Sequence, residues 1–266
     1  MISILFIVPT LNSYEYLPPL VNSLRKQSLD CWRVLFIDGH STEDHRNWLT
    51  RVCREDPRFQ WQPQWEREKG IYGAMNQGFQ LAKNSNDWVL FWGSDDRAAS
   101  PTCLEKAVRI LEDMKVSDRE PDLCVCRGKY FSDSTNKPPN QKVRFTRTSK
   151  FLWRRSLAHS LFLGSSPPHQ ATLFGPGARR LLNRYDISFS LAADLDYFLR
   201  ISRFNSVRIV NEDIDLVLMG NSGISAQQNG RRLREVSIAY RQRFGIWWYI
   251  PFVLRYLQRF HSLVRI

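Results

Sequence analysis

Two adjacent carboxylates, Asp95 and Asp96, directly follow an apolar run at residues 88–92. Such a pair can bind a divalent cation, because Mg²⁺ and Mn²⁺ prefer oxygen ligands and commonly keep one or two carboxylates plus the phosphates of a substrate. The plain alternative is that Ser94 and Asp95 cap a helix that begins near Pro101. The residues alone leave both interpretations open.

Polar side chains also follow the first two apolar runs of the chain. Pro9-Thr10-Leu11-Asn12-Ser13 comes after the run at residues 2–8, and Asp38-Gly39-His40-Ser41-Thr42 after the run at 32–37. Asp38 is placed to contact a nucleobase or a ribose, but Asp is also a common turn residue. On its own it is weak support for a nucleotide site.

A third acidic position, Asp194, lies in a predicted helix over residues 191–204. Asp194 is the better candidate for a general base, because Asp196 can pair with Arg200 one turn later. The alternative is that both acids are ordinary surface charges. His169 follows Pro167-Pro168 and, taken alone, is typical of a loop residue.

Strands and helices alternate in the first half of the sequence. Apolar runs predict strands at 2–8, 32–37, 59–62, 88–92 and 171–174, and helical periodicity predicts helices at 16–27, 43–53, 70–81, 178–184 and 191–204. This alternation is typical of an α/β fold with a Rossmann-like, mainly parallel sheet flanked by helices. Ligands bind such sheets at the carboxyl ends of the strands, which is where the polar loops lie.

Length and composition narrow the class of protein. The 266 residues, 43% hydrophobic and 24% charged, are sufficient for one large domain with a modest appendage and exclude collagen-like or broadly disordered chains. The first residues lack a basic segment and the apolar run is broken by Pro9, so we expect no signal peptide and a cytoplasmic location. The five scattered cysteines indicate reduced thiols.

The positive charge is concentrated at the C-terminus. Residues 229–266 contain eight arginines and one acid, Glu235, and so account for +7 of the net charge of +12. Residues 246–254 are uncharged and aromatic-rich, but nine residues are too few to span a bilayer. One interpretation is a peripheral contact with the anionic inner face of the cytoplasmic membrane. The other is a helix that packs on the catalytic domain.

The motifs, taken together in order, resemble glycosyltransferase family 2, the GT-A-type nucleotide-diphosphosugar transferases, and especially the branch that builds bacterial exopolysaccharides and lipopolysaccharide O-chains. The resemblance covers roughly residues 1–240. It rests on the following segments: Pro9-Thr10-Leu11-Asn12, Asp38-Gly39 with Ser41-Thr42 and Asp44, Gly70-Ile71-Tyr72 with Ala74-Met75-Asn76 and Gly78, Ser94-Asp95-Asp96, His169-Gln170, Ala193-Asp194-Leu195-Asp196 and Gly223-Ile224-Ser225.

The resemblance implies a role for each motif. The nucleotide-sugar donor would be held by Pro9, Thr10, Asn12, Asp38, Lys69, Gly70, Tyr72, Asn76, Ser94 and Asp95. Asp96 would hold Mg²⁺ or Mn²⁺, with His169 beside the metal or the diphosphate. Asp194 matches the carboxylate proposed as the general base, and the anomeric centre would be inverted. Two positions depart from the family pattern: Glu68 and Gly73 both stand where Asp is usual. Gly73 indicates either a different donor sugar or a close packing contact on that helix.

We therefore predict a GT-A-type catalytic domain at residues 1–228, with a nucleotide-binding half (1–97) and an acceptor-binding half (98–228). A basic, aromatic extension at 229–266 follows it. The predicted activity is transfer of a sugar from a UDP-, GDP- or dTDP-type donor to a glycan or polyprenyl-linked acceptor in cell-surface polysaccharide synthesis. Two alternatives remain: a nucleotidyltransferase, and a non-catalytic nucleic-acid-binding protein suggested by the charge. The sequence contains no nucleic-acid motif, so we expect no nucleic-acid partner.

Overall fold

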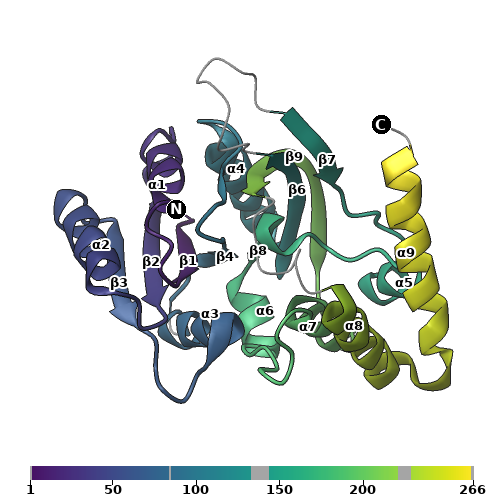
Figure 1. Ribbon diagram of the computed structural model, residues 1–266. Coiled ribbons are helices and arrows are strands. Elements are labelled where there is room, and N and C mark those ends of the chain that lie inside the picture. The colour runs from purple at the N-terminus through teal and green to yellow at the C-terminus, as the bar shows by residue number, and fades with distance from the viewer. Residues whose placement is uncertain (1, 84, 133–143, 221–228, 265–266) are drawn as a thin grey trace.

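The computed structural model describes residues 2–83, 85–132, 144–220 and 229–264, and Figure 1 shows a central sheet with helices on both of its faces. The strands are β1 (Ile4–Thr10), β2 (Trp32–Asp38), β3 (Phe59–Pro63), β4 (Trp88–Phe91), β5 (Arg97–Ala98), β6 (Leu123–Ser132), β7 (Arg144–Ser149), β8 (Thr172–Phe174) and β9 (Ile209–Gly220). The helices are α1 (Leu17–Arg25), α2 (Glu43–Glu55), α3 (Gly70–Leu81), α4 (Cys103–Val116), α5 (Leu157–Phe162), η1 (His169–Ala171), α6 (Pro176–Leu181), α7 (Ala193–Ile201), α8 (Asn229–Phe244), η3 (Gly245–Trp248) and α9 (Tyr249–Val264).

The described strands form one mixed sheet in the order β3-β2-β1-β4-β8-β6-β9-β5, with β7 paired to β6. Strands β3, β2, β1 and β4 are parallel neighbours, and α1, α2 and α3 supply the crossovers that parallel pairing requires. Beyond β4 the direction changes, because β8 is antiparallel to both β4 and β6. The predicted α/β fold is confirmed, and its parallel part is concentrated in the N-terminal half.

The sheet is buried on both faces. In β1, Ile4, Phe6 and Val8 pack with α1, α2 and α4, whereas Leu5 and Ile7 pack with α3 and α7 on the other face. Alternate residues of a strand point to opposite faces, so a strand covered on both sides must be apolar throughout. This is why β1 and β4 are apolar almost throughout, as is β2 from Val34 to Ile37.

Strand β1 extends two residues beyond its predicted end, through Pro9 to Thr10. Proline has no N–H to donate to a neighbouring strand. Pro9 is tolerated because β1 has lost its β4 neighbour by that point: the pairing with β4 ends at Ile7, while that with β2 continues through Pro9. Pro9 and Thr10 therefore end a strand rather than begin a loop.

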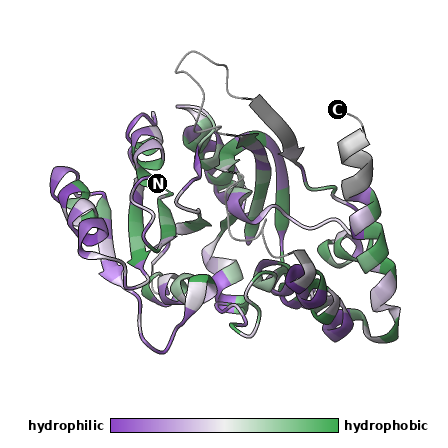
Figure 2. Ribbon diagram, in the orientation of Figure 1, coloured by the Kyte–Doolittle hydropathy of each residue, from purple (hydrophilic) through white to green (hydrophobic). Residues whose placement is uncertain are grey.

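The C-terminal helices pack on the domain. Val236, Ala239 and Tyr240 of α8 are buried in the core, and Arg255 of α9 donates from Nη1 to Ser166 Oγ at 2.8 Å. Figure 2 shows hydrophilic α8 beside the more hydrophobic segment that joins it to α9. In the part of the chain that the structure describes, no helix is both long and apolar enough to cross a membrane.

Candidate active site

The carboxyl ends of β1, β2 and β4 lie together with the three loops that follow them, and we call residues 9–13, 38–42 and 93–96, strand ends included, the three-loop edge. Asn12 accepts from the Thr42 N–H at 2.8 Å and donates its own N–H to Ser41 Oγ at 2.9 Å. Ser13 Oγ and Ser94 Oγ are 2.8 Å apart. These bonds bring together the first, second and fourth strand ends, as the sequence predicted for a parallel sheet.

The three-loop edge contains buried polar atoms that the protein leaves without partners. Asp38 is 1% exposed, and its Oδ2 accepts from the Ser41 N–H at 3.1 Å. Its Oδ1 and the Oγ1 of Thr10 are buried with no hydrogen-bond partner among the described residues. Unpaired buried polar atoms are costly, so a ligand that bonds to them is expected. A nucleoside has suitable donors on its base and ribose.

His45 lies next to Asp38 in the interior of the protein. The fully buried His45 ring lies with Nε2 3.5 Å from Asp38 Oδ1. Burial lowers the pKa of His45, and the nearby Asp38 charge only partly opposes this. No sequence pattern assigns His45 a special role; only the tertiary contact with Asp38 connects it to the site.

The acidic turn after β4 holds its two carboxylates differently. Asp96 is 2% exposed, and its Oδ2 accepts from the Gly93 N–H at 2.7 Å. Asp95 is half-buried. Burial and the neighbouring Asp95 charge raise the pKa of Asp96 well above its ordinary value. Neither Ser94 nor Asp95 caps α4, because β5 intervenes and Thr102 is the N-cap of that helix.

This donor set fits Mg²⁺ or Mn²⁺ held jointly with a diphosphate. The Asp95 charge contributes to the raised pKa of Asp96, because the two carboxylates repel each other. A bound cation would reduce this repulsion. The described residues contain no cluster of three or more His, Cys, Asp or Glu side chains arranged for a metal. Such a site would therefore depend on substrate oxygens, as magnesium sites with one or two carboxylates commonly do.

The start of α3 explains both departures from the family pattern. A Cβ on Gly73 would lie 2.6 Å from the backbone oxygen of Glu68, so only glycine fits there. Glu68 is buried, and its Oε1 pairs with Arg184 Nη2 at 3.0 Å. Close packing is thus sufficient to explain Gly73, and Glu68 forms a structural ion pair. Lys69 and Gly70, predicted to contact the donor, are both exposed at this helix start.

Asn76 is engaged in a way that the sequence did not predict. Its side chain is 1% exposed, its Oδ1 accepts from the Tyr185 N–H at 2.7 Å, and its Nδ2 donates to the Tyr185 carbonyl at 3.1 Å. The predicted contact of Asn76 with the donor stays a prediction. Asn76 fixes the backbone of Tyr185, which itself belongs to the next group of residues.

Asp194 lies among aromatic and imidazole side chains, and we call Tyr72, His169, Tyr185 and Asp194 the base cluster. The Tyr72 hydroxyl donates to Asp194 Oδ1 at 3.5 Å, and Tyr185 OH lies 2.8 Å from His169 Nε2. Burial lowers the pKa of His169 to about 4, against the opposing Asp194 charge, so this ring is neutral at pH 7. Asp196 points elsewhere and pairs with Arg200 Nε at 2.7 Å, as predicted.

The two groups are connected through the end of β4. Phe91 stacks on His169 with ring centroids 5.3 Å apart, and Trp92 Nε1 donates to the Gln170 carbonyl at 2.9 Å. The segment with His169 is therefore fixed to the strand that leads into Asp95 and Asp96. The predicted Gly223-Ile224-Ser225 motif lies outside the described residues.

Sequence reasoning missed a residue that holds the base cluster in place. Glu235 of α8 is 7% exposed, and its Oε2 accepts from three consecutive backbone N–H groups, those of Ser190, Leu191 and Ala192, at 3.0, 2.7 and 3.1 Å. These amides immediately precede α7 and Asp194. The only available signal was that Glu235 is the single acid in the basic C-terminal segment.

Comparison with known proteins identifies the family. Residues 5–175, about two thirds of the chain, match glycosyl transferase family 2. The chain belongs to glycosyl transferase family 2. It is therefore a glycosyltransferase, of the class that uses nucleotide-sugar donors. The family match includes the whole three-loop edge and His169 but ends before Asp194 and Glu235.

Two relatives carry glycosyltransferase names. A PGL/p-HBAD biosynthesis glycosyltransferase of Mycobacterium bovis (strain BCG / Pasteur 1173P2) is 24% identical over 194 residues, which are 73% of this chain and 67% of the relative. An uncharacterized glycosyltransferase of Mycobacterium tuberculosis (strain ATCC 25618 / H37Rv) is 31% identical over 170 residues, which are 62% of this chain and 55% of the relative.

Solved structures of two glycosyltransferases share the fold. Residues 1–349 of S. aureus TarS in complex with UDP-GlcNAc superpose with a TM-score of 0.65 at 18% identity, covering 91% of this chain and 68% of that one. The mannosyltransferase PcManGT of Pyrobaculum calidifontis, in complex with GDP-Man and Mn²⁺, gives 0.63 at 15% identity, covering 98% and 72%. At these identities the likeness establishes the fold.

Proposed function

We propose that this glycosyltransferase is inverting and metal-dependent, and that it transfers one sugar from a nucleotide-diphosphosugar to a hydroxyl of a glycan or polyprenyl-linked acceptor in cell-surface polysaccharide synthesis. The observation that carries the proposal is the connection of the acidic turn to the base cluster through β4 and the Trp92–Gln170 bond. Diphosphate-binding acids and a base are the two groups that such a transfer requires.

The nucleoside binds at the three-loop edge, where Thr10 Oγ1 forms no hydrogen bond with the described residues and Asp38 Oδ1 has only the His45 ring nearby, at 3.5 Å. Pro9, Asn12 and Ser94 line the same edge, and the diphosphate lies over the acidic turn beside Lys69 and Gly70. The TarS structure contains UDP-GlcNAc, and the PcManGT structure contains GDP-Man and Mn²⁺. A UDP, GDP or dTDP donor is consistent with this arrangement.

Asp95 would make the principal metal contact, whereas Asp96 holds the turn. Asp95 is the more exposed of the two acids, whereas one oxygen of Asp96 is occupied by the Gly93 N–H. When bound, Mg²⁺ or Mn²⁺ supplies positive charge to the departing diphosphate. The neutral His169 ring lies beside the phosphates without adding charge.

Asp194 takes the proton of the acceptor hydroxyl. That oxygen then forms a bond to the anomeric carbon while the bond to the diphosphate oxygen breaks, and the nucleoside diphosphate leaves. The base and the leaving group lie on opposite sides of the sugar, so the anomeric centre is inverted. Tyr72 donates to Oδ1 of Asp194 and so fixes the carboxylate while Oδ2 accepts the proton.

The acceptor is reached at an anionic membrane surface, on the inner face of the cytoplasmic membrane. Ile246, Trp247, Tyr249, Val253 and Leu257 are 50–79% exposed along η3 and α9, and we call these five residues the apolar stripe. Aromatic and aliphatic side chains next to arginines are typical of helices that rest in a lipid interface. The opposite face of α9 packs on the domain.

A thermal-shift panel tests the donor assignment. UDP, GDP, dTDP and CMP are each added with and without Mn²⁺, and we expect one diphosphate to stabilise the protein only when Mn²⁺ is present. Product analysis with the matching nucleotide sugar should then show inverted stereochemistry. Stabilisation by a nucleoside triphosphate with release of diphosphate would favour a nucleotidyltransferase, and stabilisation by oligonucleotides alone would favour a nucleic-acid-binding protein.

A further inference from the structure

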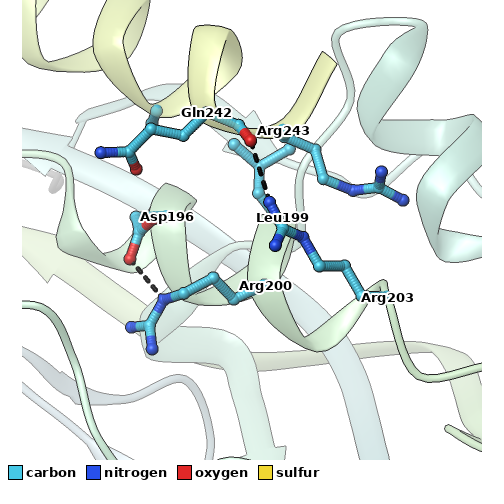
Figure 3. Close-up of a pocket in the computed structure, with 7 residues that line it drawn as sticks. Asp196, Leu199, Arg200, Arg203, Gln242 and Arg243 are labelled. Atoms are coloured by element: carbon cyan, nitrogen blue, oxygen red, sulfur yellow. Dashed lines mark hydrogen bonds and ion pairs between the residues drawn. The ribbon is translucent and has the colours of Figure 1, made fainter. Parts of the chain in front are cut away.

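A hollow of about 270 Å³ separates α7 from α8 on the side of α7 away from the base cluster. Figure 3 shows Arg200 and Arg203 of α7 beneath Gln242 and Arg243 of α8 around this space. Since a water takes up about 30 Å³ in the liquid, the hollow has room for a tetrahedral anion with part of its hydration shell.

The hollow has an excess of positive charge. Its one acid, Asp196, is committed to Arg200. Arg203 donates from Nη2 to the Gln242 carbonyl at 2.9 Å, and Arg243 Nε lies 3.4 Å from Ser202 Oγ. Neither Arg203 nor Arg243 forms an ion pair among the described residues, and burial together with Arg203 lowers the pKa of Arg243. Two guanidinium groups thus share a space without a matching carboxylate.

Phosphate is the chemistry that this arrangement favours. Guanidinium groups present several N–H donors in a plane and bind phosphate oxygens with charge-assisted hydrogen bonds. Arg203 and Arg243 have N–H groups beyond those used for Gln242 and Ser202. An anionic oxygen between them would reduce their mutual repulsion.

The apolar stripe begins three residues after Arg243. Ile246 and Trp247 are 79% and 56% exposed, and Arg241 stacks on the Trp248 ring at 4.3 Å. Only two residues of the chain, Phe244 and Gly245, therefore separate the hollow from exposed apolar side chains. A second copy of the chain is a poor occupant, because both copies carry a net charge of +12.

We propose that the hollow between α7 and α8 binds the phosphate of an anionic phospholipid headgroup, while the apolar stripe enters the acyl-chain region beside it. This inference rests on the membrane contact of the proposed function. It adds a headgroup site on α7, the helix that carries Asp194, so that lipid binding places the base cluster at a fixed position relative to the membrane.

Vesicle flotation of the full chain tests the site. Vesicles of phosphatidylcholine alone are compared with vesicles containing phosphatidylglycerol. For Arg203→Gln/Arg243→Gln we expect binding to the phosphatidylglycerol vesicles to fall about 25-fold, from about fivefold for each arginine. The matched control, Arg51→Gln/Arg234→Gln, removes the same charge from exposed positions outside the hollow and should lose less than threefold. Thermal unfolding confirms that each variant is folded.

The remaining outcomes separate the two proposals. Equal losses in both double variants would overturn the headgroup site and leave general charge attraction. If Trp247→Ser/Val253→Ser/Leu257→Ser loses binding while the hollow variant keeps it, the membrane contact stands and the headgroup site is wrong. Stabilisation by inorganic phosphate that requires Arg203 and Arg243, without any vesicle binding, would assign the hollow to a soluble phosphate and refute the lipid.

Discussion

The three-loop edge and the base cluster are constructed in different ways. In the edge, short loops follow parallel strands and bond to one another, as in the Asn12–Thr42 and Ser13–Ser94 contacts. In the base cluster, Tyr72, His169 and Asp194 come from three distant elements, and Glu235 of a fourth holds the backbone before Asp194. The edge is therefore set by strand order, whereas the cluster depends on long-range packing. Substitutions can distinguish the two.

The largest effect is expected at the acidic turn. Asp95→Asn should lower the transfer rate about 10³-fold, because the developing charge of the diphosphate loses its metal contact. Asp96→Asn should cost about tenfold, since Asn retains an oxygen for the Gly93 N–H. Steady-state rates with saturating Mn²⁺ measure both, with thermal unfolding as the control. Equal losses of rate in the two variants would contradict the assignment of the principal metal contact to Asp95.

The base is tested next. Asp194→Asn should lower kcat about 10²- to 10³-fold and leave donor affinity nearly unchanged, because general-base catalysis acts on the acceptor. Tyr72→Phe removes only the 3.5 Å bond to Asp194 and should lower kcat less than tenfold. Isothermal titration with the nucleoside diphosphate and Mn²⁺ gives the affinity. A fall in donor affinity in step with kcat would remove Asp194 from the role of base.

Glu235 tests the long-range support of the base cluster. Glu235→Ala leaves three amides before α7 unbonded and should lower the free energy of unfolding by about 3 kcal/mol and kcat about tenfold, with donor affinity unchanged. Glu235→Gln, which retains an acceptor oxygen, should recover most of kcat. Arg231→Gln is the matched control: it removes the half-exposed ion pair to Glu235, worth less than about 1 kcal/mol, and the exposed 2.7 Å bond from Arg231 Nη2 to Ser190 Oγ, but keeps the Glu235 carboxylate. A kcat equal to wild type in Glu235→Ala would assign Glu235 to folding alone.

Gly73 tests whether close packing explains the departure from the family pattern. Gly73→Ala should lower the free energy of unfolding by about 1–3 kcal/mol, because a Cβ would overlap the Glu68 backbone. Gly73→Asp should lower the free energy of unfolding further and should not change the preferred donor sugar. Urea unfolding and a panel of nucleotide sugars measure the two effects. A switch of donor preference in a folded Gly73→Asp variant would show that this position selects the sugar.

The last effect is spread over a range of pH and is small at any single pH near neutrality. The folded-state pKa of His169 is about 4, below the ordinary 6.5, so the unfolded chain binds the proton first as the pH falls. The stability that His169 contributes is complete above pH 6.5 and decreases towards pH 4, by about 3 kcal/mol in total. His45 acts in the same direction. His169→Asn should flatten the pH dependence of the unfolding free energy more than His45→Asn; the reverse order would contradict the pKa of His169.

Sequence patterns predicted the nucleotide half of the fold well, for a physical reason. Strands β1 and β4, and β2 from Val34 to Ile37, are buried on both faces and so are apolar runs, and the polar residues that follow them must gather at one edge. Single positions were less predictable. Asn76 belongs to a family motif, and the structure adds that its amide bonds to the Tyr185 backbone; Asp96, the predicted metal ligand, is only 2% exposed.

The C-terminal segment shows what its sequence pattern could not predict. Its arginines and aromatic residues were equally consistent with lipid contact and with packing on the domain. The structure shows that one face of the segment packs, through Tyr240 and Arg255, and that the other face exposes the apolar stripe. Composition does not say which side of a helix a residue occupies. Only the packing of α8 and α9 on the domain decides which of these residues are buried and which are exposed.

The amino-acid sequence by itself determined the α/β class, the three-loop edge and the family, because burial on both faces of a parallel sheet and tight polar loops are local patterns along the chain. Tertiary structure alone decided that Glu235 holds the backbone before Asp194, that His169 is neutral, and that Arg203 and Arg243 share one hollow. Those properties depend on which side chains, distant in the sequence, bury one another from solvent in the folded protein. Residue spacing along the chain does not determine these contacts.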